Sequence, residues 1–212
     1  MVNGKELTNF ITHCIGVAFG IAALIALLVK SAPDPYKVVG VLIYGISLIC
    51  LYVASSLYHV FKAFRDSAPL AQKFDHIAIY CLIAGTYTPI CLTLLRGVWG
   101  WSLLIAIWSL AIFGIVFKAV FFEKIKWLNY GLYLVMGWLV VIAFYPLIKA
   151  VPLNGIYWMI AGGLCYTVGA VIMYADRPKR TFFSVWSAHQ FWHLLVLAGS
   201  ACHFTFILEY LL

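Results

Sequence analysis

Long apolar runs repeat along the whole chain and are separated by short stretches of polar and charged residues. Each run is close to 20 residues long, which is the length of α-helix that crosses the hydrocarbon core of a bilayer. Continuous apolar runs favour helices over barrel strands, in which apolar and polar residues alternate. We therefore predict an all-α, polytopic membrane protein, a bundle of seven transmembrane helices. The predicted spans are residues 10–29, 38–61, 74–95, 100–121, 127–147, 155–175 and 184–211.

The composition agrees with this prediction and limits the number of domains. The 212 residues are 65% hydrophobic and only 10% charged, and the mean hydropathy of +1.02 is that of a membrane protein. Seven spans leave only short loops, so we expect residues 1–212 to form a single domain. The first run is too long for a signal peptide, and its Gly16-x-x-x-Gly20 pattern is typical of a helix-packing face.

The positive charges predict the orientation of the bundle. The side that holds the N-terminus has ten Lys and Arg residues, namely Lys5, Lys62, Arg65, Lys73, Lys118, Lys124, Lys126, Arg177, Lys179 and Arg180. The other side has four, namely Lys30, Lys37, Arg96 and Lys149. Because cytoplasmic loops are richer in Lys and Arg, we expect a cytoplasmic N-terminus and an outside C-terminus. The net charge of +7 then belongs to membrane loops and does not indicate a nucleic-acid partner.

Histidines stand near the predicted cytoplasmic ends of two spans. His189 and His193 are four residues apart, so they share one face of the last helix. His59 ends the second span with Ser55 one turn before it, and Asp75 begins the third span. Ionisable residues inside a membrane segment are costly and indicate function. Since all these residues have similar predicted depth, we expect them to form one site.

Three neutral imidazoles suit Zn²⁺ and leave a fourth position for water, as in catalytic zinc sites. Zinc makes hydroxide available near neutral pH, and Asp75 is the candidate general base that orients the water. Ser55 is the candidate hydrogen-bond donor to the water or to a substrate oxygen. Copper, iron and nickel also bind imidazole, so zinc is inferred from ligand preference alone.

Other polar residues are assigned structural roles. We predict that His13 is hydrogen-bonded or interfacial, and that His203, about 15 Å beyond His193 along the helix, lies too far away to share the metal. His76 points about 100° away from Asp75 and is expected at a helix contact. The segment Gly85–Pro89 is interpreted as a helix kink, or alternatively as part of the wall of a polar cavity.

Four motifs together resemble a known family. These are Ser55-x-x-x-His59, Phe74-Asp-His76, the stretch Ile83–Pro89 and His189-x-x-x-His193. They resemble the hemolysin III family of bacterial membrane proteins, which belongs with the progestin and adiponectin receptors and, more distantly, the alkaline ceramidases. The resemblance implies a seven-helix protein of the bacterial inner membrane. It also implies zinc held by His59, His189 and His193 near the inner leaflet, with Asp75 and Ser55 beside the bound water.

Three functions stay open at this point. The first is a zinc-dependent, ceramidase-like hydrolase acting on a lipid amide at the inner leaflet, because the predicted site would meet lipid head groups. The second is a non-enzymatic sensor or regulator of the membrane with structural zinc. The third is a pore-forming haemolysin, as the family name suggests, although the sequence has no amphipathic helix with the repeated charges of a pore lining.

Overall fold

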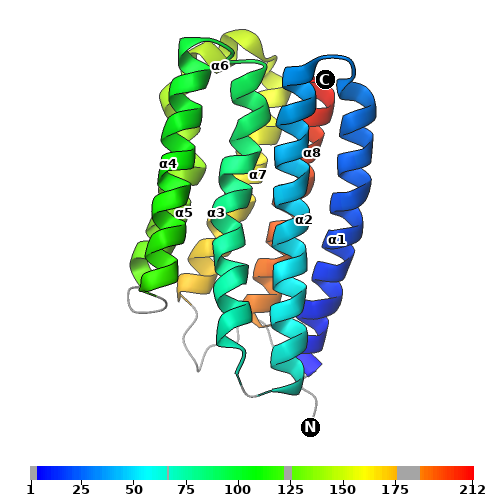
Figure 1. Ribbon diagram of the computed structural model, residues 1–212, viewed down its shortest axis with the longest axis vertical. Helices are drawn as coiled ribbons and strands as arrows, with labels where there is room; N and C mark the ends of the chain where they lie inside the picture. The colour runs from blue at the N-terminus through cyan, green and yellow to red at the C-terminus, as the bar shows by residue number, and fades with distance from the viewer. Residues whose placement is uncertain (1–3, 66, 122–125, 176–186) are drawn as a thin grey trace.

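The computed structural model describes residues 4–65, 67–121, 126–175 and 187–212, and these residues form helices that stand side by side, with no strand among them (Figure 1). The elements are α1 (Gly4–Ser31), α2 (Pro35–Phe64), α3 (Pro69–Leu92), α4 (Val98–Val120), α5 (Lys126–Trp138), η1 (Leu139–Ala143), α6 (Phe144–Ala150), α7 (Leu153–Ala175) and α8 (Ala188–Tyr210). The start of α1 and the end of α8 lie at opposite ends of the bundle. The predicted all-α architecture is confirmed.

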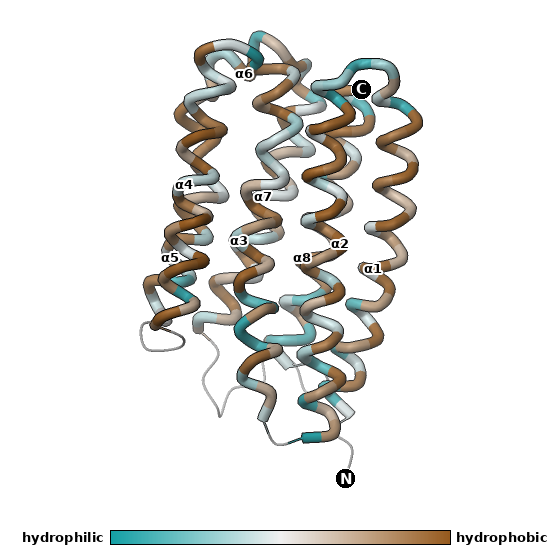
Figure 2. The backbone as a smooth tube through the Cα atoms, viewed as in Figure 1, coloured by the Kyte–Doolittle hydropathy of each residue, from teal (hydrophilic) through white to brown (hydrophobic). Residues whose placement is uncertain are grey.

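Among the described helices, six segments are long and apolar enough to cross a membrane: α1, α2, α4, the α5–α6 segment, α7 and α8. Figure 2 shows apolar residues along most of their length. The protein is therefore a multi-pass membrane protein. The predicted third span is not among the six, because α3 carries too many polar residues.

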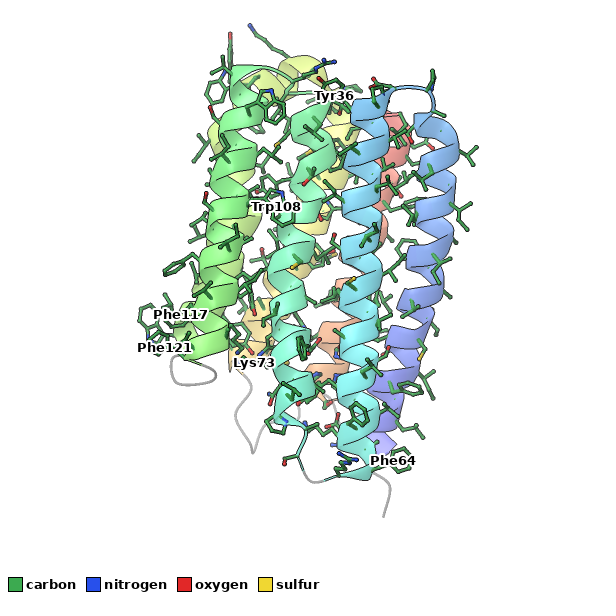
Figure 3. The ribbon with its side chains drawn as sticks, viewed as in Figure 1. Tyr36, Phe64, Lys73, Trp108, Phe117 and Phe121 are labelled. Atoms are coloured by element: carbon green, nitrogen blue, oxygen red, sulfur yellow. The ribbon has the colours of Figure 1, made fainter. Side chains whose placement is uncertain are left out.

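The surroundings of α3 explain this difference from the prediction. The helix packs against α2, α4, α5 and α8, and most of its second half is buried. Trp108 of α4 lies beside α3 (Figure 3). Its indole donates a hydrogen bond to the Thr88 hydroxyl of α3 at 3.2 Å. A helix that is covered by other helices can carry polar residues without exposing them to lipid.

Two helices extend beyond the predicted spans. The first helix begins at Gly4, before the predicted span 10–29, and α3 begins at Pro69, before the predicted span 74–95. Both helices extend into polar turns that a hydropathy window leaves out, since helix geometry does not require apolar residues. The predicted span 127–147 is interrupted by the 3₁₀ segment η1. Residues 184–186 of the last predicted span lie outside the described residues.

Pro89 lies inside α3, which continues past it to Leu92. The Thr86 and Thr88 hydroxyls donate to the carbonyls of Leu82 and Ala84, at 2.8 and 2.9 Å. Thr86 and Tyr87 also line a cavity inside the bundle. The structure thus favours the second interpretation of this segment, as part of a cavity wall.

One face of α1 packs closely against α2. Glu6, Asn9, His13, Gly16 and Gly20 are spaced three or four residues apart, and all are buried. A methyl group added at Gly16 would overlap the ring of Tyr52 on α2. The small residue therefore sets how near α1 approaches α2.

Replacing Gly16 by alanine is expected to lower the free energy of unfolding by about 1–3 kcal/mol, the usual cost of overpacking. Gly131 on α5 is the matched control, because a methyl group there meets no atom of the described residues within 4 Å. Gly131→Ala should leave stability unchanged or raise it by up to about 1 kcal/mol. Thermal unfolding in detergent, followed by tryptophan fluorescence, measures both changes. Equal melting temperatures for the two variants would contradict the close α1–α2 packing.

Candidate metal centre

The start of α8 is fixed by its own sequence. The Ser187 hydroxyl accepts a hydrogen bond from the Gln190 backbone at 3.3 Å, and the Gln190 side chain accepts one from the Ser187 backbone at 2.9 Å. This reciprocal pair is a capping box, which satisfies two free N–H groups at a helix start. It places His189 in the first turn of α8 and His193 one turn later.

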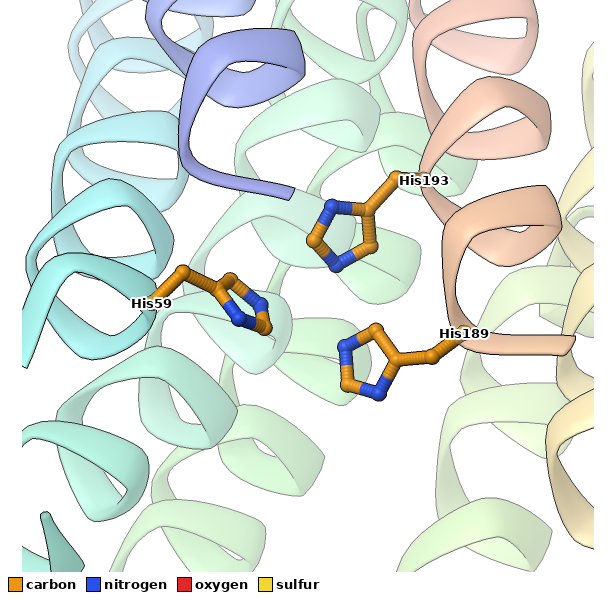
Figure 4. Close-up of side chains that lie close together, drawn as sticks. All are labelled: His59, His189 and His193. Carbon is orange, nitrogen blue, oxygen red and sulfur yellow. The ribbon is translucent and has the colours of Figure 1, made fainter. Parts of the chain in front are cut away.

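His59 of α2 meets these two histidines across the bundle. The potential ligand atoms of His59, His189 and His193 all lie within 4.8 Å of one another. The ring centroids form a nearly equal-sided triangle, with separations of 4.9, 4.7 and 4.8 Å. Figure 4 shows the three rings converging on a common space from α2 and α8. The cluster joins two helices that are far apart in the sequence.

The three imidazoles of the cluster are the kind of ligands that bind a metal ion such as zinc. Tetrahedral zinc with Zn–N bonds of about 2.0–2.1 Å places two ligand nitrogens about 3.3 Å apart. The potential ligand atoms of the three imidazoles, within 4.8 Å of one another, are close to that spacing. Among the described residues, Nε2 of His59 is buried and has no hydrogen-bond partner. Buried polar atoms normally have a partner, and a metal ion would supply one here.

A carboxylate lies behind His59. Glu6 of α1 places Oε2 2.6 Å from Nδ1 of His59, and its other oxygen lies 2.9 Å from the Lys62 ammonium. Metal-binding histidines usually direct their second nitrogen to a carboxylate or a carbonyl in this way. The contact leaves Nε2 as the nitrogen of His59 that is free to bind a ligand.

The cluster opens onto a cavity of ≈ 500 Å³ inside the bundle. Asp75 of α3 and Ser55 of α2 line this cavity, and the Ser55 hydroxyl is a hydrogen-bond partner of the Asp75 carboxylate. Lys118 of α4 lines the same cavity, and its positive charge attracts the Asp75 carboxylate electrostatically. The cavity therefore combines imidazoles, a carboxylate, a hydroxyl and an ammonium group.

The sequence predicted much of this arrangement. His59, His189 and His193 come together as a cluster, and Asp75 and Ser55 face the adjoining cavity. His203 lies outside the cluster and stacks on Tyr166, with a centroid separation of 5.6 Å. His76, which we expected at a helix contact, also lines the cavity.

The prediction that His13 is hydrogen-bonded or interfacial was wrong. Its ring is 3% exposed, and neither ring nitrogen has a hydrogen-bond partner among the described residues. It stacks on His193 instead, with centroids 3.7 Å apart and planes inclined by 22°. On α1 alone His13 has no partner, so only the tertiary packing of α1 against α8 reveals its place beside the cluster.

Sequence reasoning also missed Glu6 and Lys118. Glu6 was missed because it precedes the first predicted span, which begins at residue 10. Its spacing of seven residues from His13 would place both on one face of a longer helix. Lys118 was counted as a loop charge, but its side chain is 2% exposed. A lysine inside an apolar run was the available signal, because such a residue needs partners in the bundle.

Replacing His13 by phenylalanine is expected to raise the free energy of unfolding of the metal-free protein by about 1–3 kcal/mol. The change keeps the stacking on His193 and removes two buried nitrogens that have no described partner. Metal affinity should stay unchanged because His13 is not part of the three-histidine cluster. Calorimetric melting and metal titration measure the two quantities. Loss of metal binding in this variant would make His13 a member of the ligand set.

Helices that can cross a membrane and a buried three-histidine cluster define a helical, multi-pass membrane protein with a candidate metal centre. Over residues 1–204 the sequence matches the family described as Haemolysin-III related, and the chain belongs to that family. The resemblance predicted from the motifs is confirmed.

Relatives of the chain come from bacteria and animals. It is 39% identical to the hemolysin-3 homolog of Bacillus subtilis, covering 97% of this chain and 94% of that protein. It is also 39% identical to hemolysin-3 of Bacillus cereus, covering 98% and 92%. The human monocyte to macrophage differentiation factor is a more distant relative, 28% identical over 98% of this chain and 84% of that protein.

Proposed function

We propose that this protein is a zinc-dependent hydrolase of the bacterial inner membrane that cleaves a lipid amide at the inner leaflet. His59, His189 and His193 are the proposed zinc ligands, and Asp75 and Ser55 are the proposed catalytic residues. The observation that carries the proposal is the convergence of three imidazoles beside a cavity that also holds a carboxylate and its hydroxyl partner.

The proposed topology is a single domain of residues 1–212 with seven spans, α3 being the seventh. The opposite placement of the start of α1 and the end of α8 supports an odd number of crossings. The excess of Lys and Arg supports a cytoplasmic N-terminus. This orientation places the histidine cluster on the side of the inner leaflet.

When bound, zinc supplies a Lewis acid and activates water near neutral pH. Asp75 accepts a proton from the water that attacks the amide carbonyl. The Ser55 hydroxyl orients the Asp75 carboxylate by donating a hydrogen bond to it. A C–O bond forms, the amide C–N bond breaks, and the proton passes to the leaving amine. The products are a fatty acid and an amine.

The cavity suits a lipid amide better than a small polar substrate. Its walls combine the polar residues near the cluster with aromatic and aliphatic side chains that an acyl chain can contact. These apolar and aromatic residues include Leu51, Tyr58, Ile79, Leu82, Ile83, Tyr87, Leu134, Trp138, Tyr166, Met173, Trp192 and Val196.

Turnover of a fluorescent short-chain ceramide by the purified, zinc-loaded protein in detergent micelles tests the proposal. We expect release of the labelled fatty acid, its loss after treatment with a chelator, and its return when zinc is restored. A zinc-loaded, folded sample that releases no fatty acid from ceramides or other N-acyl lipids would contradict the hydrolase.

A second function has one observation in its favour. The cluster joins α2 to α8, so a bound ion would clamp helices far apart in the sequence, as a structural metal in a membrane sensor or regulator would. This function predicts a large rise in melting temperature with zinc and no substrate turnover. Haemolysis, suggested by the names of the Bacillus relatives, predicts dye leakage from liposomes that hold the purified protein.

A further inference from the structure

Glu6 connects the first helix to the histidine cluster through two polar contacts on α2. Its Oε2 lies 2.6 Å from Nδ1 of His59, and its Oε1 lies 2.9 Å from the ammonium of Lys62. His59 is fully buried, and the Glu6 side chain is 11% exposed. The pair is therefore sheltered from solvent on the side of the cluster.

The contact determines which nitrogen of His59 can bind a metal. An ionised carboxylate only accepts hydrogen bonds, so Nδ1 of the neutral ring carries the hydrogen and donates it to Glu6. Nε2 is then left with its lone pair. Nε2 is also the buried atom that has no hydrogen-bond partner among the described residues.

We propose that Glu6 is a positioning residue of the metal centre, which fixes the ring tautomer and the direction of His59. Lys62 holds the second oxygen of Glu6 and so keeps the carboxylate in place. This inference rests on the proposed metal site. It makes α1 the third helix of a centre whose ligands come from α2 and α8.

A plain ion pair between α1 and α2 is the competing explanation. The Lys62 side chain is 35% exposed, and exposed ion pairs contribute little to stability. An ion pair would stabilise the metal-free and the metal-loaded protein to the same degree. A positioning residue changes metal affinity as well, because an unoriented His59 must be ordered when the ion binds.

The test compares zinc affinity of the purified full chain in detergent, measured by competition with a chromogenic chelator. The variants are Glu6→Ala and Glu6→Gln, whose amide oxygen still accepts a hydrogen bond from Nδ1. Glu209→Ala is the matched control, since Glu209 is an exposed glutamate of α8 that lies near Lys30, at 3.9 Å. Visible absorption of the Co²⁺-loaded protein reports the coordination of the ion in each variant.

We expect Glu6→Ala to weaken zinc affinity by about 10- to 100-fold with the number of sites unchanged, the usual effect of removing such a partner. Glu6→Gln should fall between Glu6→Ala and the wild type, and Glu209→Ala should match the wild type. The Co²⁺ spectrum of Glu6→Ala should differ from that of the wild type.

Wild-type affinity and an unchanged Co²⁺ spectrum in both Glu6 variants would overturn the positioning role while leaving the metal site intact. A wild-type protein that binds neither zinc nor Co²⁺ would instead refute the proposed metal site, and the role of Glu6 with it. If Glu6→Ala does not fold, the affinity of Glu6→Gln decides between the two explanations.

Discussion

Replacing Asp75 by asparagine is expected to reduce turnover of a lipid amide by about 100- to 10,000-fold, the range that general acid–base catalysis contributes. Asparagine has nearly the same shape but cannot take up the proton from the attacking water. Metal content should stay unchanged, because the three histidines supply the proposed ligands. Ser55→Ala should reduce turnover less, since it removes only a hydrogen bond to the carboxylate.

Turnover and metal content are measured on the same preparation. Asp34→Asn is the matched control: Asp34 caps the start of α2, where asparagine caps equally well, and it does not line the cavity. That variant should keep both metal and activity. Undiminished turnover by Asp75→Asn would remove Asp75 from the mechanism.

Replacing His193 by alanine is expected to weaken zinc affinity on the order of 1,000-fold, because one of three ligands is lost from the site. The His193 side chain is almost fully buried. Because a ligand that binds only the folded state stabilises it, we expect zinc to raise the melting temperature of the wild type and not that of this variant. Titration with zinc in a chelator-buffered solution measures the affinity.

His203→Ala is the control for this prediction. His203 is also a histidine of α8 that lines the cavity, but it stacks on Tyr166 and is not one of the three clustered histidines. We expect it to retain wild-type zinc affinity. Equal losses in the two variants would show that neither effect reports a specific ligand.

The bundle could be predicted because lipid imposes a simple length and polarity requirement on each span. α1, α2, α4, α7 and α8 satisfy it and were found near their predicted positions. The character of α3 could not be predicted, because hydropathy does not reveal that other helices cover it. The interruption of the fifth span by η1 also has no strong sequence signal, as the 3₁₀ segment consists of ordinary apolar residues.

The histidine cluster was predictable because His189 and His193 share one face of the last helix. His59 was added because the predicted topology places it at the same depth in the membrane. The surrounding residues were harder to predict. Glu6 and His13 reach the cluster from α1, which approaches α2 closely at Gly16. Such a contact depends on the packing of helices, which the pattern along one helix does not determine.

The metal content of the wild-type protein tests the central claim most directly. Elemental analysis of protein purified in detergent without added metal should find about one zinc ion per chain, as expected for a three-histidine site with one open position. A folded sample that contains no metal, and takes up none when zinc is supplied, would contradict the account. The three histidines would then be a buried polar cluster without a ligand role.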